Sequence, residues 1–165
     1  MKLYHYTAED NLGSILENGL TRGELPLSPS KVVKAISLTT DPCPRGHGLS
    51  DDEQISELHR VKLAAAGVCV PPGARYKNKR AIRITLQLPS NSVTSWLPWA
   101  RRKLEQSWFD VMVETGGGID KARTWWFSIK PIPPAKFVTV EYSDGADGWL
   151  SDCEFMNMKP IEGVQ

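Results

Sequence analysis

Residues 81–88 carry the clearest pattern in the chain, with a strict alternation of apolar and polar side chains from Ile82 to Leu88. The alternation separates two sets of side chains: Ile82, Ile84, Leu86 and Leu88 against Arg83, Thr85 and Gln87. A period of two is typical of a β-strand with one face on the core. The pattern therefore predicts a strand over residues 81–88, with Arg83 on its polar face.

The first twenty residues predict a strand followed by a helix. Residues 2–6 alternate and are rich in aromatic side chains, which is typical of a strand. Thr7 with Asp10 three residues later resembles a capping box, which satisfies free backbone N–H groups at the start of a helix. Apolar side chains then recur at helical spacing, at Leu12, Ile15, Leu16 and Leu20. Gly19 is placed to end this helix, because glycine readily adopts the conformation of a helix C-terminus.

The remaining sequence predicts more strands than helices. Further strands are expected at residues 35–40, 109–114, 125–129 and 137–142. Helices are expected from Ser92 or Ser95 to Trp108 and, with weak amphipathicity, within residues 51–63. This order favours an α+β fold with two small, packed, mostly antiparallel sheets and a few flanking helices. We expect one domain over residues 1–145 and an irregular tail over residues 146–165.

Composition narrows the class of protein. The chain of 165 residues is 41% hydrophobic and 24% charged with a net charge of +1, as in an ordinary globular domain. A general polyanion binder would carry a basic excess, so broad nucleic-acid affinity is not indicated, although a local basic patch stays open. Cys43, Cys69 and Cys153 are too scattered for a disulfide framework and indicate reduced thiols. Without a leader-like start or a long apolar run, we expect a soluble cytoplasmic protein with no membrane partner.

The sequence does not indicate several common catalytic sites. His5, His47 and His59 lack the spacing of metal ligands, and there is no Gly-x-Ser-x-Gly elbow. The Gly46-His47-Gly48 loop could bring backbone amides close to a phosphate, but it matches no established phosphate-binding fingerprint. The six tryptophans all lie in the second half, where they serve either as packing residues or as platforms for stacked bases.

Two short runs supply candidate ligand-binding residues. His5 can offer a ring nitrogen to a ribose hydroxyl, and Tyr6 can offer a flat ring to an aromatic base. Ser37 and Thr39 place hydroxyls near the end of a predicted strand, where they can hydrogen-bond a sugar. The structural alternatives are simple: His5 is an ordinary strand residue, Thr7 is a helix cap, and the hydroxyls cap a turn.

Taken in order, these runs resemble the ADP-ribosyltransferase superfamily. The run Leu3-Tyr4-His5-Tyr6-Thr7, the helix that follows it, and Ile36-Ser37-Leu38-Thr39-Thr40 are similar to the first two motifs of that family. Trp126-Phe127-Ser128-Ile129, followed by Ile132-Pro133-Pro134 and Phe137-Val138, is similar to its closing strand pair. The similarity is nearest to DarT-type DNA ADP-ribosyltransferases and RNA 2′-phosphotransferases.

The resemblance implies that NAD lies folded in a cleft between two small sheets. The cofactor-binding residues that it implies are His5, Tyr6, Thr7, Ser37, Leu38 and Thr39. His5 would contact the ribose or adenosine side, and Tyr6 or a later aromatic residue would stack on nicotinamide. In such transferases the nicotinamide–ribose bond breaks through an oxocarbenium-like state, which a carboxylate stabilises.

The sequence departs from the family at the catalytic residues. The position of the usual glutamate falls near Thr124 or Trp125. Glu114, just before a glycine-rich segment, is the candidate carboxylate, and Glu141 on the last predicted strand is a poorer candidate. Arg83 is the candidate cation for a diphosphate. For each of these charged residues the alternative is an ordinary solvent-facing side chain.

Three hypotheses about function follow. The first is an NAD-dependent mono-ADP-ribosyltransferase that modifies a protein or nucleic acid, in the toxin, phage or host-defence setting that the resemblance implies. The second is a catalytically degenerate member that binds NAD, ADP-ribose or a related nucleotide without transferring it. The third is a structural adaptor that uses its tryptophans as a contact surface and has no nucleotide affinity.

Overall fold

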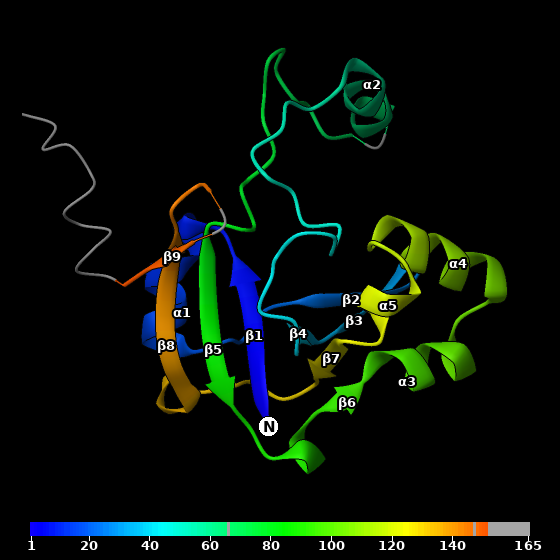
Figure 1. Cartoon of the computed structure of the whole chain (residues 1–165). Helices are drawn as coiled ribbons and strands as arrows, with labels where there is room; N and C mark the ends of the chain where they lie inside the picture. Colours follow the sequence, from blue (N-terminus) through cyan, green and yellow to red (C-terminus); the bar gives the residue numbers. More distant parts are fainter. Residues whose placement is uncertain (66, 147, 152–165) are drawn as a thin grey trace, which may run out of the picture.

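The computed structural model describes residues 1–65, 67–146 and 148–151 (Figure 1). Its strands in chain order are β1 Lys2–Thr7, β2 Glu24–Ser28, β3 Lys31–Lys34, β4 Ile36–Thr39, β5 Ile82–Gln87, β6 Thr94–Ser95, β7 Trp125–Ser128, β8 Phe137–Ser143 and β9 Trp149–Leu150. Its helices are α1 Leu12–Asn18, α2 Glu57–Ala65, α3 Trp96–Lys103, α4 Gln106–Thr115 and α5 Ile119–Ala122. Short 3₁₀ turns occupy Glu9–Asn11, Ser90–Ser92 and Pro134–Lys136.

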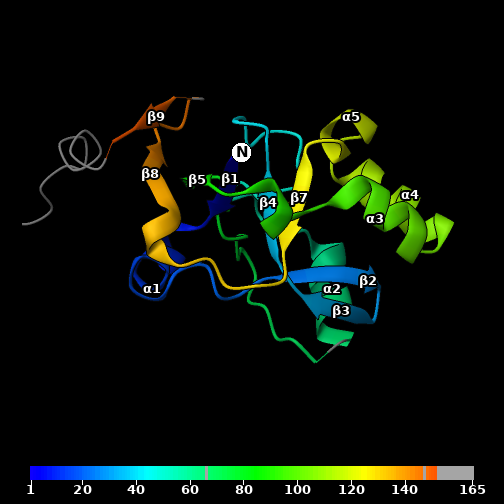
Figure 2. The same ribbon diagram turned by 90° about the horizontal axis from the view of Figure 1, so that it is seen from below.

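One large antiparallel sheet dominates the fold. It has seven strands in the order β6-β7-β4-β1-β5-β8-β9, while β2 and β3 form a separate hairpin. The ladders between these strands are antiparallel throughout the described residues. Helices α3, α4 and α5 lie beyond β7, whereas α1 lies toward β8 (Figure 2). The expected α+β class is therefore confirmed, but the two sheets are very unequal in size.

The apolar face of β5 forms the centre of the first core cluster. Ile82, Ile84 and Leu86 are fully buried, as the alternation over residues 81–88 predicts. They pack with Leu3 of β1 and Leu12 of α1. The same period-two and helical patterns that define these elements in the sequence thus supply the contacts between them.

A second core cluster joins α3, α4 and α5 to β7. Trp96 of α3 stacks on Phe109 of α4 with ring centroids 5.8 Å apart. Ala100, Ala122 and Phe127 are buried in the same cluster. Offset aromatic pairs of this kind add to the burial of their large apolar areas. This cluster forms one side of the candidate site.

The expected strand over residues 109–114 is wrong, because this segment lies in α4. Its β-branched valines favour a strand locally, but Phe109, Met112 and Val113 share one helical face that packs against the second core cluster. Tertiary burial outweighs the weak local preference. The helix expected from Ser92 or Ser95 to Trp108 is instead two helices, α3 beginning after Ser95 and α4, with extended backbone at the junction.

Thr7 is not the cap of α1, contrary to the prediction. It is the last residue of β1, and its Oγ1 accepts a hydrogen bond from Nδ2 of Asn11 at 3.0 Å. The residue before α1 is Asn11, whose side chain does not cap the helix. Gly19 ends α1 as predicted, with a positive φ of 78° that disfavours other residues.

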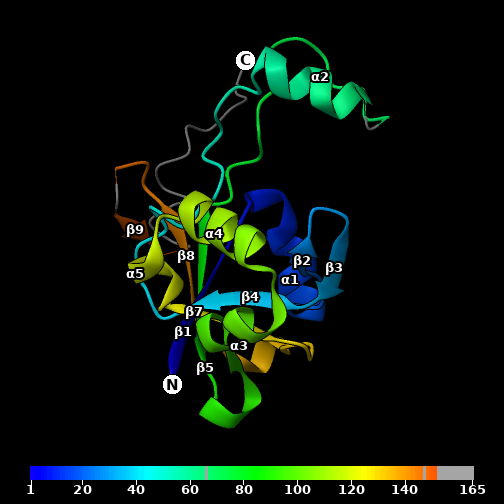
Figure 3. The same ribbon diagram turned by 90° about the vertical axis from the view of Figure 1, so that its right-hand side faces the viewer.

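Residues 50–80 leave the body of the molecule as an arm that carries α2 (Figures 1 and 3). The stem of the arm is held by an antiparallel bridge between Gln54 and Arg75. Within the arm, Nε of Arg60 donates to the carbonyl of Val70 at 3.1 Å. No residue of α2 is buried among those described.

The sequence patterns did not predict the β2–β3 hairpin or β9. Pro26 lies within β2, which is tolerated because the hairpin is a separate two-stranded unit. β9 pairs with β8 inside the segment expected as an irregular tail, and residues 152–165 lie outside the described part. Cys43 and Cys69 are exposed free thiols. Within the described chain, none of the helices has the length and apolar character needed to cross a membrane.

Candidate functional site

A cavity of about 300 Å³ opens where β1 and β4 separate. It is walled by β1, β2, β4 and β7, by α3 and α4, and by the loop at residues 47–49. The residues that line it are Tyr4, His5, Tyr6, Glu24, Leu25, Pro26, Ser37, Leu38, Thr39, His47, Gly48, Leu49, Trp96, Met112, Thr115, Gly116, Trp125 and Trp126. Most of these side chains are aromatic or aliphatic, which is typical of a small-molecule site.

The cavity exists because the pairing of β1 with β4 is short. Tyr4 and Thr39 form the registered pair between these strands, whereas β1 pairs with β5 along its whole length. Beyond Tyr4 the side chain of His5 bridges the gap, with its Nδ1 2.9 Å from the carbonyl oxygen of Ser37. A carbonyl only accepts hydrogen bonds, so Nδ1 carries the proton and Nε2 is left as an acceptor. Burial lowers the pKa of His5 despite the opposing effect of this hydrogen bond, which favours the neutral ring.

Tyr6 lines the cavity, and its hydroxyl and its ring both have defined partners. The hydroxyl donates to the carbonyl oxygen of Asp41 at 2.9 Å. The ring stacks on Trp149 with centroids 5.9 Å apart. Burial raises the pKa of Tyr6, so the phenol stays neutral. These two contacts fix the position of the Tyr6 ring.

A chain of four side chains fixes the Trp125 wall of the cavity. Nε1 of Trp125 donates to Nδ1 of His47 at 2.8 Å. Nε2 of His47 lies 3.3 Å from Oδ2 of Asp41 without forming an aligned hydrogen bond, and Nζ of Lys121 donates to the same oxygen at 2.5 Å. No local sequence pattern predicts this chain, because its members come from two segments, residues 41–47 and 121–125, that lie about 80 positions apart.

The charges in this chain are well defined. Burial lowers the pKa of His47, and the Lys121 cation lowers it further, against the opposing pull of Asp41. For Asp41, burial acts to raise the pKa, but the Lys121 ammonium and the backbone N–H of Cys43 outweigh it and hold the pKa below its ordinary value. The arrangement is therefore an Asp41–Lys121 ion pair beside a neutral His47.

Glycines allow the loop that carries His47 to lie against the turn between α4 and α5. A Cβ added to Gly117 would lie 1.8 Å from the carbonyl oxygen of Gly46, and one added to Gly48 would lie 2.7 Å from that of Thr115. A Cβ on Gly116 would lie 2.1 Å from the ring of Trp125. Close backbone and ring approach thus accounts for these glycines, and the loop forms a wall of the cavity.

The structure brings five of the six predicted cofactor-binding residues together. His5, Tyr6, Ser37, Leu38 and Thr39 all line the cavity. Thr39 also has a structural task, since its Oγ1 lies 2.9 Å from Oγ1 of Thr124 across the β4–β7 ladder.

Thr7 is the predicted cofactor-binding residue that does not line the cavity. It is buried and hydrogen-bonded to Asn11. Its hydroxyl therefore serves the junction between β1 and α1.

The two candidate catalytic residues lie away from the cavity lining. Glu114 is exposed on α4. Arg83 forms a bidentate ion pair with Glu141, at 3.0 and 2.9 Å, and lies over the ring of Trp149 at 4.3 Å. Burial acts to raise the pKa of Glu141, but Arg83 outweighs it and lowers that pKa. The carboxylate that does line the cavity is Glu24, which the sequence patterns did not single out.

Comparison with protein-family models, with curated proteins and with solved structures finds no match for this chain. No cluster of three or more metal-ligating side chains occurs among the described residues.

Proposed function

We propose that this protein binds NAD, ADP-ribose or a related nucleotide in the cavity beside β1, β4 and β7, and that it does so without transferring ADP-ribose. The observation that carries the proposal is the fixed aromatic wall of the cavity. Trp125 is held by His47 and by the edge-on ring of Trp96, with centroids 4.8 Å apart, and Tyr6 is held by Asp41. Rings fixed in advance bind a planar base with little loss of conformational entropy.

The size of the cavity favours one half of a dinucleotide. Its volume of about 300 Å³ lies at the lower end of the range for small-molecule sites. A base with its ribose fills such a space, and the rest of the dinucleotide then extends past the cavity mouth. His5, with Nε2 left as an acceptor, supplies a partner for a ribose hydroxyl.

Binding without transfer is favoured by the positions of the expected catalytic residues. Glu114 is exposed outside the cavity lining, and Arg83 is engaged by Glu141 and by the carbonyl of Pro42. An oxocarbenium-like state needs a carboxylate close to the breaking bond. An arginine already in a bidentate pair would have to leave it to bind a diphosphate.

A transferase remains the second candidate because of Glu24. Glu24 is the first residue of β2 and is an acidic residue of the cavity lining. A carboxylate in that place could stabilise the positive charge that develops on a ribose, or deprotonate an acceptor. In that case the protein would be an ADP-ribosyltransferase acting on a protein or nucleic acid, in the conflict setting that the resemblance implies.

Parallel measurements of binding and turnover test the proposal. The protein is titrated with NAD, nicotinamide mononucleotide, ADP-ribose and AMP, and released nicotinamide is followed by chromatography. We expect binding without nicotinamide release, and loss of binding in Trp125→Leu. Trp99→Leu is the matched control, because Trp99 packs edge-on against Phe127 and does not line the cavity.

The outcomes separate the candidates. Binding of nicotinamide mononucleotide but not of AMP would assign the cavity to the nicotinamide end, and the reverse would assign it to the adenine end. Nicotinamide release that is lost in Glu24→Gln but kept in Glu114→Gln would overturn binding without turnover and assign NAD cleavage to Glu24, as the transferase candidate requires. No binding of any of the four compounds would overturn both candidates and favour the adaptor.

A further inference from the structure

Basic side chains gather on three neighbouring segments of the molecule. Residues 20–36, 99–105 and 128–136 together hold eight basic residues and two acidic ones, in a chain whose net charge is only +1. The rest of the chain is therefore net acidic. We call the surface formed by these three segments the basic face.

The fold brings the first and third segments side by side. Leu20 forms a bridge with Ile132, and Ile36 pairs with Ser128. Lys34 stands two residues before Ile36, and Lys130 stands two residues after Ser128. The cations of these segments thus come from neighbouring strands and connections of one surface.

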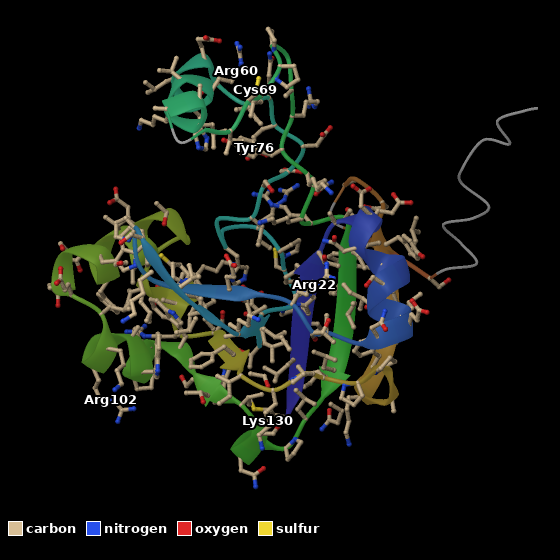
Figure 4. All side chains as sticks on the ribbon, turned by 180° about the vertical axis from the view of Figure 1, so that it is seen from behind. Arg22, Arg60, Cys69, Tyr76, Arg102 and Lys130 are labelled. Carbon is tan, nitrogen blue, oxygen red and sulfur yellow. The ribbon has the colours of Figure 1, made fainter. Side chains whose placement is uncertain are left out.

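The second segment completes the basic face from α3. Ala100 of α3 packs in one core cluster with Leu25 and Ala35, which belong to the first segment. Arg101 and Arg102 follow directly and are exposed. In Figure 4, Arg102 extends from α3 on the body of the molecule, which also carries the labelled Arg22 and Lys130, away from the arm.

No ion pair in the described part of the chain gives the cations of the basic face an acidic partner. Among the described residues, the ion pairs engage other basic side chains, such as Arg83, Arg123 and Lys121. Arg22, Lys34 and their neighbours on this face are exposed and outside those pairs. Exposed unpaired cations gathered on one face create a local positive potential that attracts an acidic partner.

Two exposed apolar side chains belong to the same segments as these cations. Val32 is 50% exposed and lies on the same face of β3 as Lys34, and Ile129 is 73% exposed and precedes Lys130 in the chain. The aromatic side chain of these segments, Trp99, is half-buried and packs edge-on against Phe127, whereas single-stranded nucleic acid typically stacks on several open aromatic rings. A phosphate backbone offers nothing for Val32 and Ile129 to bury against, whereas a protein surface that mixes carboxylates with aliphatic side chains complements both features.

We propose that the basic face docks a partner protein through a surface of carboxylates interleaved with aliphatic side chains. This inference goes beyond the nucleotide site and does not depend on it. The β2–β3 hairpin contributes to both, since Leu25 lines the cavity and Lys31 and Lys34 lie on the opposing strand. A protein docked on this face therefore lies against the hairpin that walls the nucleotide site.

The test uses fluorescently labelled peptides as probes for the partner surface. We expect a peptide of alternating glutamate and valine to bind the intact protein, and to bind more tightly than an all-glutamate peptide. A peptide of alternating lysine and valine is not expected to bind. Affinity should fall as salt rises, since exposed charges are screened beyond about 10 Å at 0.1 M ionic strength.

Variants locate the binding on the basic face. The double variant Lys34→Glu with Lys130→Glu should weaken binding of the glutamate–valine peptide at least ten-fold. The double variant Arg101→Glu with Arg102→Glu should have the same effect. The second variant keeps the test valid if the first one fails to fold. Lys79→Glu, on the stem of the arm, is the matched control and should leave binding unchanged.

Three results would overturn the proposal. They are equal binding of the lysine–valine peptide, full binding by both charge-reversed variants, and tighter binding of duplex DNA or of anionic lipid vesicles than of the glutamate–valine peptide. Nucleotide titration of the same variants separates this inference from the nucleotide site. Reversing these exposed charges should leave nucleotide affinity intact, because none of these cations lines the cavity.

Discussion

The indole N–H of Trp125 donates to Nδ1 of His47 across 2.8 Å, and this bond sets the protonation state of the histidine. A tryptophan N–H can only donate, so Nδ1 of His47 must be unprotonated. Protonating the ring would place two donors against each other and would release Trp125 from its place in the cavity wall.

Lower pH should therefore weaken the fold through His47. Burial lowers the pKa of His47 from its ordinary value of 6.5, so the unfolded chain takes up the proton before the folded protein does. The contribution of a neutral His47 to the free energy of unfolding is fully present well above pH 6.5. It falls as the pH drops from there toward the lowered pKa of the folded state. His5 acts in the same direction, because its pKa is also lowered. Urea unfolding between about pH 8 and about pH 5 measures the slope.

His47→Gln isolates this contribution. Glutamine can accept from Trp125 but does not titrate, so the variant should lose stability less steeply than the parent as the pH falls. An identical slope in His47→Gln would show that His47 does not carry the effect.

Gly116→Ala should disturb the wall of the cavity. The added Cβ would lie 2.1 Å from the ring of Trp125, so the ring must shift. Overpacking of this kind typically costs about 1–3 kcal/mol of stability. Thermal unfolding measures the loss, and nucleotide titration should show weaker binding. Gly13→Ala is the matched control: nothing lies within 4 Å of its Cβ in α1, so it should stabilise the protein by about 0.5–1 kcal/mol.

Removing the cation of the Arg83–Glu141 pair should cost stability without changing the cavity. Arg83→Met leaves the half-buried carboxylate of Glu141 without its bidentate partner, and lost hydrogen bonds to a charged group cost about 1.5–3 kcal/mol. Nucleotide affinity should stay within two-fold of the parent's, because Arg83 does not line the cavity. Strongly reduced affinity in a stably folded Arg83→Met would instead support a direct contact with a diphosphate.

Local sequence patterns predict those strands and helices whose buried face can be recognised from their own residues. β5 and β8 alternate, β1 and β7 are rich in aromatic side chains, and all four are strands as predicted, while Gly19 ends α1. The prediction fails where contacts with other elements determine the structure. The valines of α4 favour a strand locally, but packing against α3 makes the segment a helix. Pro26 is untypical of a strand, so the sequence pattern does not indicate β2.

About half of the candidate site could be predicted from the sequence. The runs around His5 and Ser37 lie on the neighbouring strands β1 and β4, and their side chains meet at the cavity. The other half depends on contacts that no local pattern encodes. Lys121 meets Asp41 across 80 positions of sequence, and Trp125 meets His47 across 78, because the topology places β7 beside β4.

We expect His5 to contribute both to the stability of the sheet beside the cavity and to nucleotide binding. Its Nδ1 replaces the missing backbone pairing to Ser37, and its Nε2 is the acceptor that the proposed ribose contact uses. His5→Leu removes both groups and should lower nucleotide affinity, with a loss of stability of about 0.5–1.5 kcal/mol for the bond to the Ser37 carbonyl. His5→Gln keeps a donor and an acceptor and should recover most of the stability. Calorimetric titration and urea unfolding of the two variants measure both effects, and unchanged affinity in His5→Leu would remove His5 from the site.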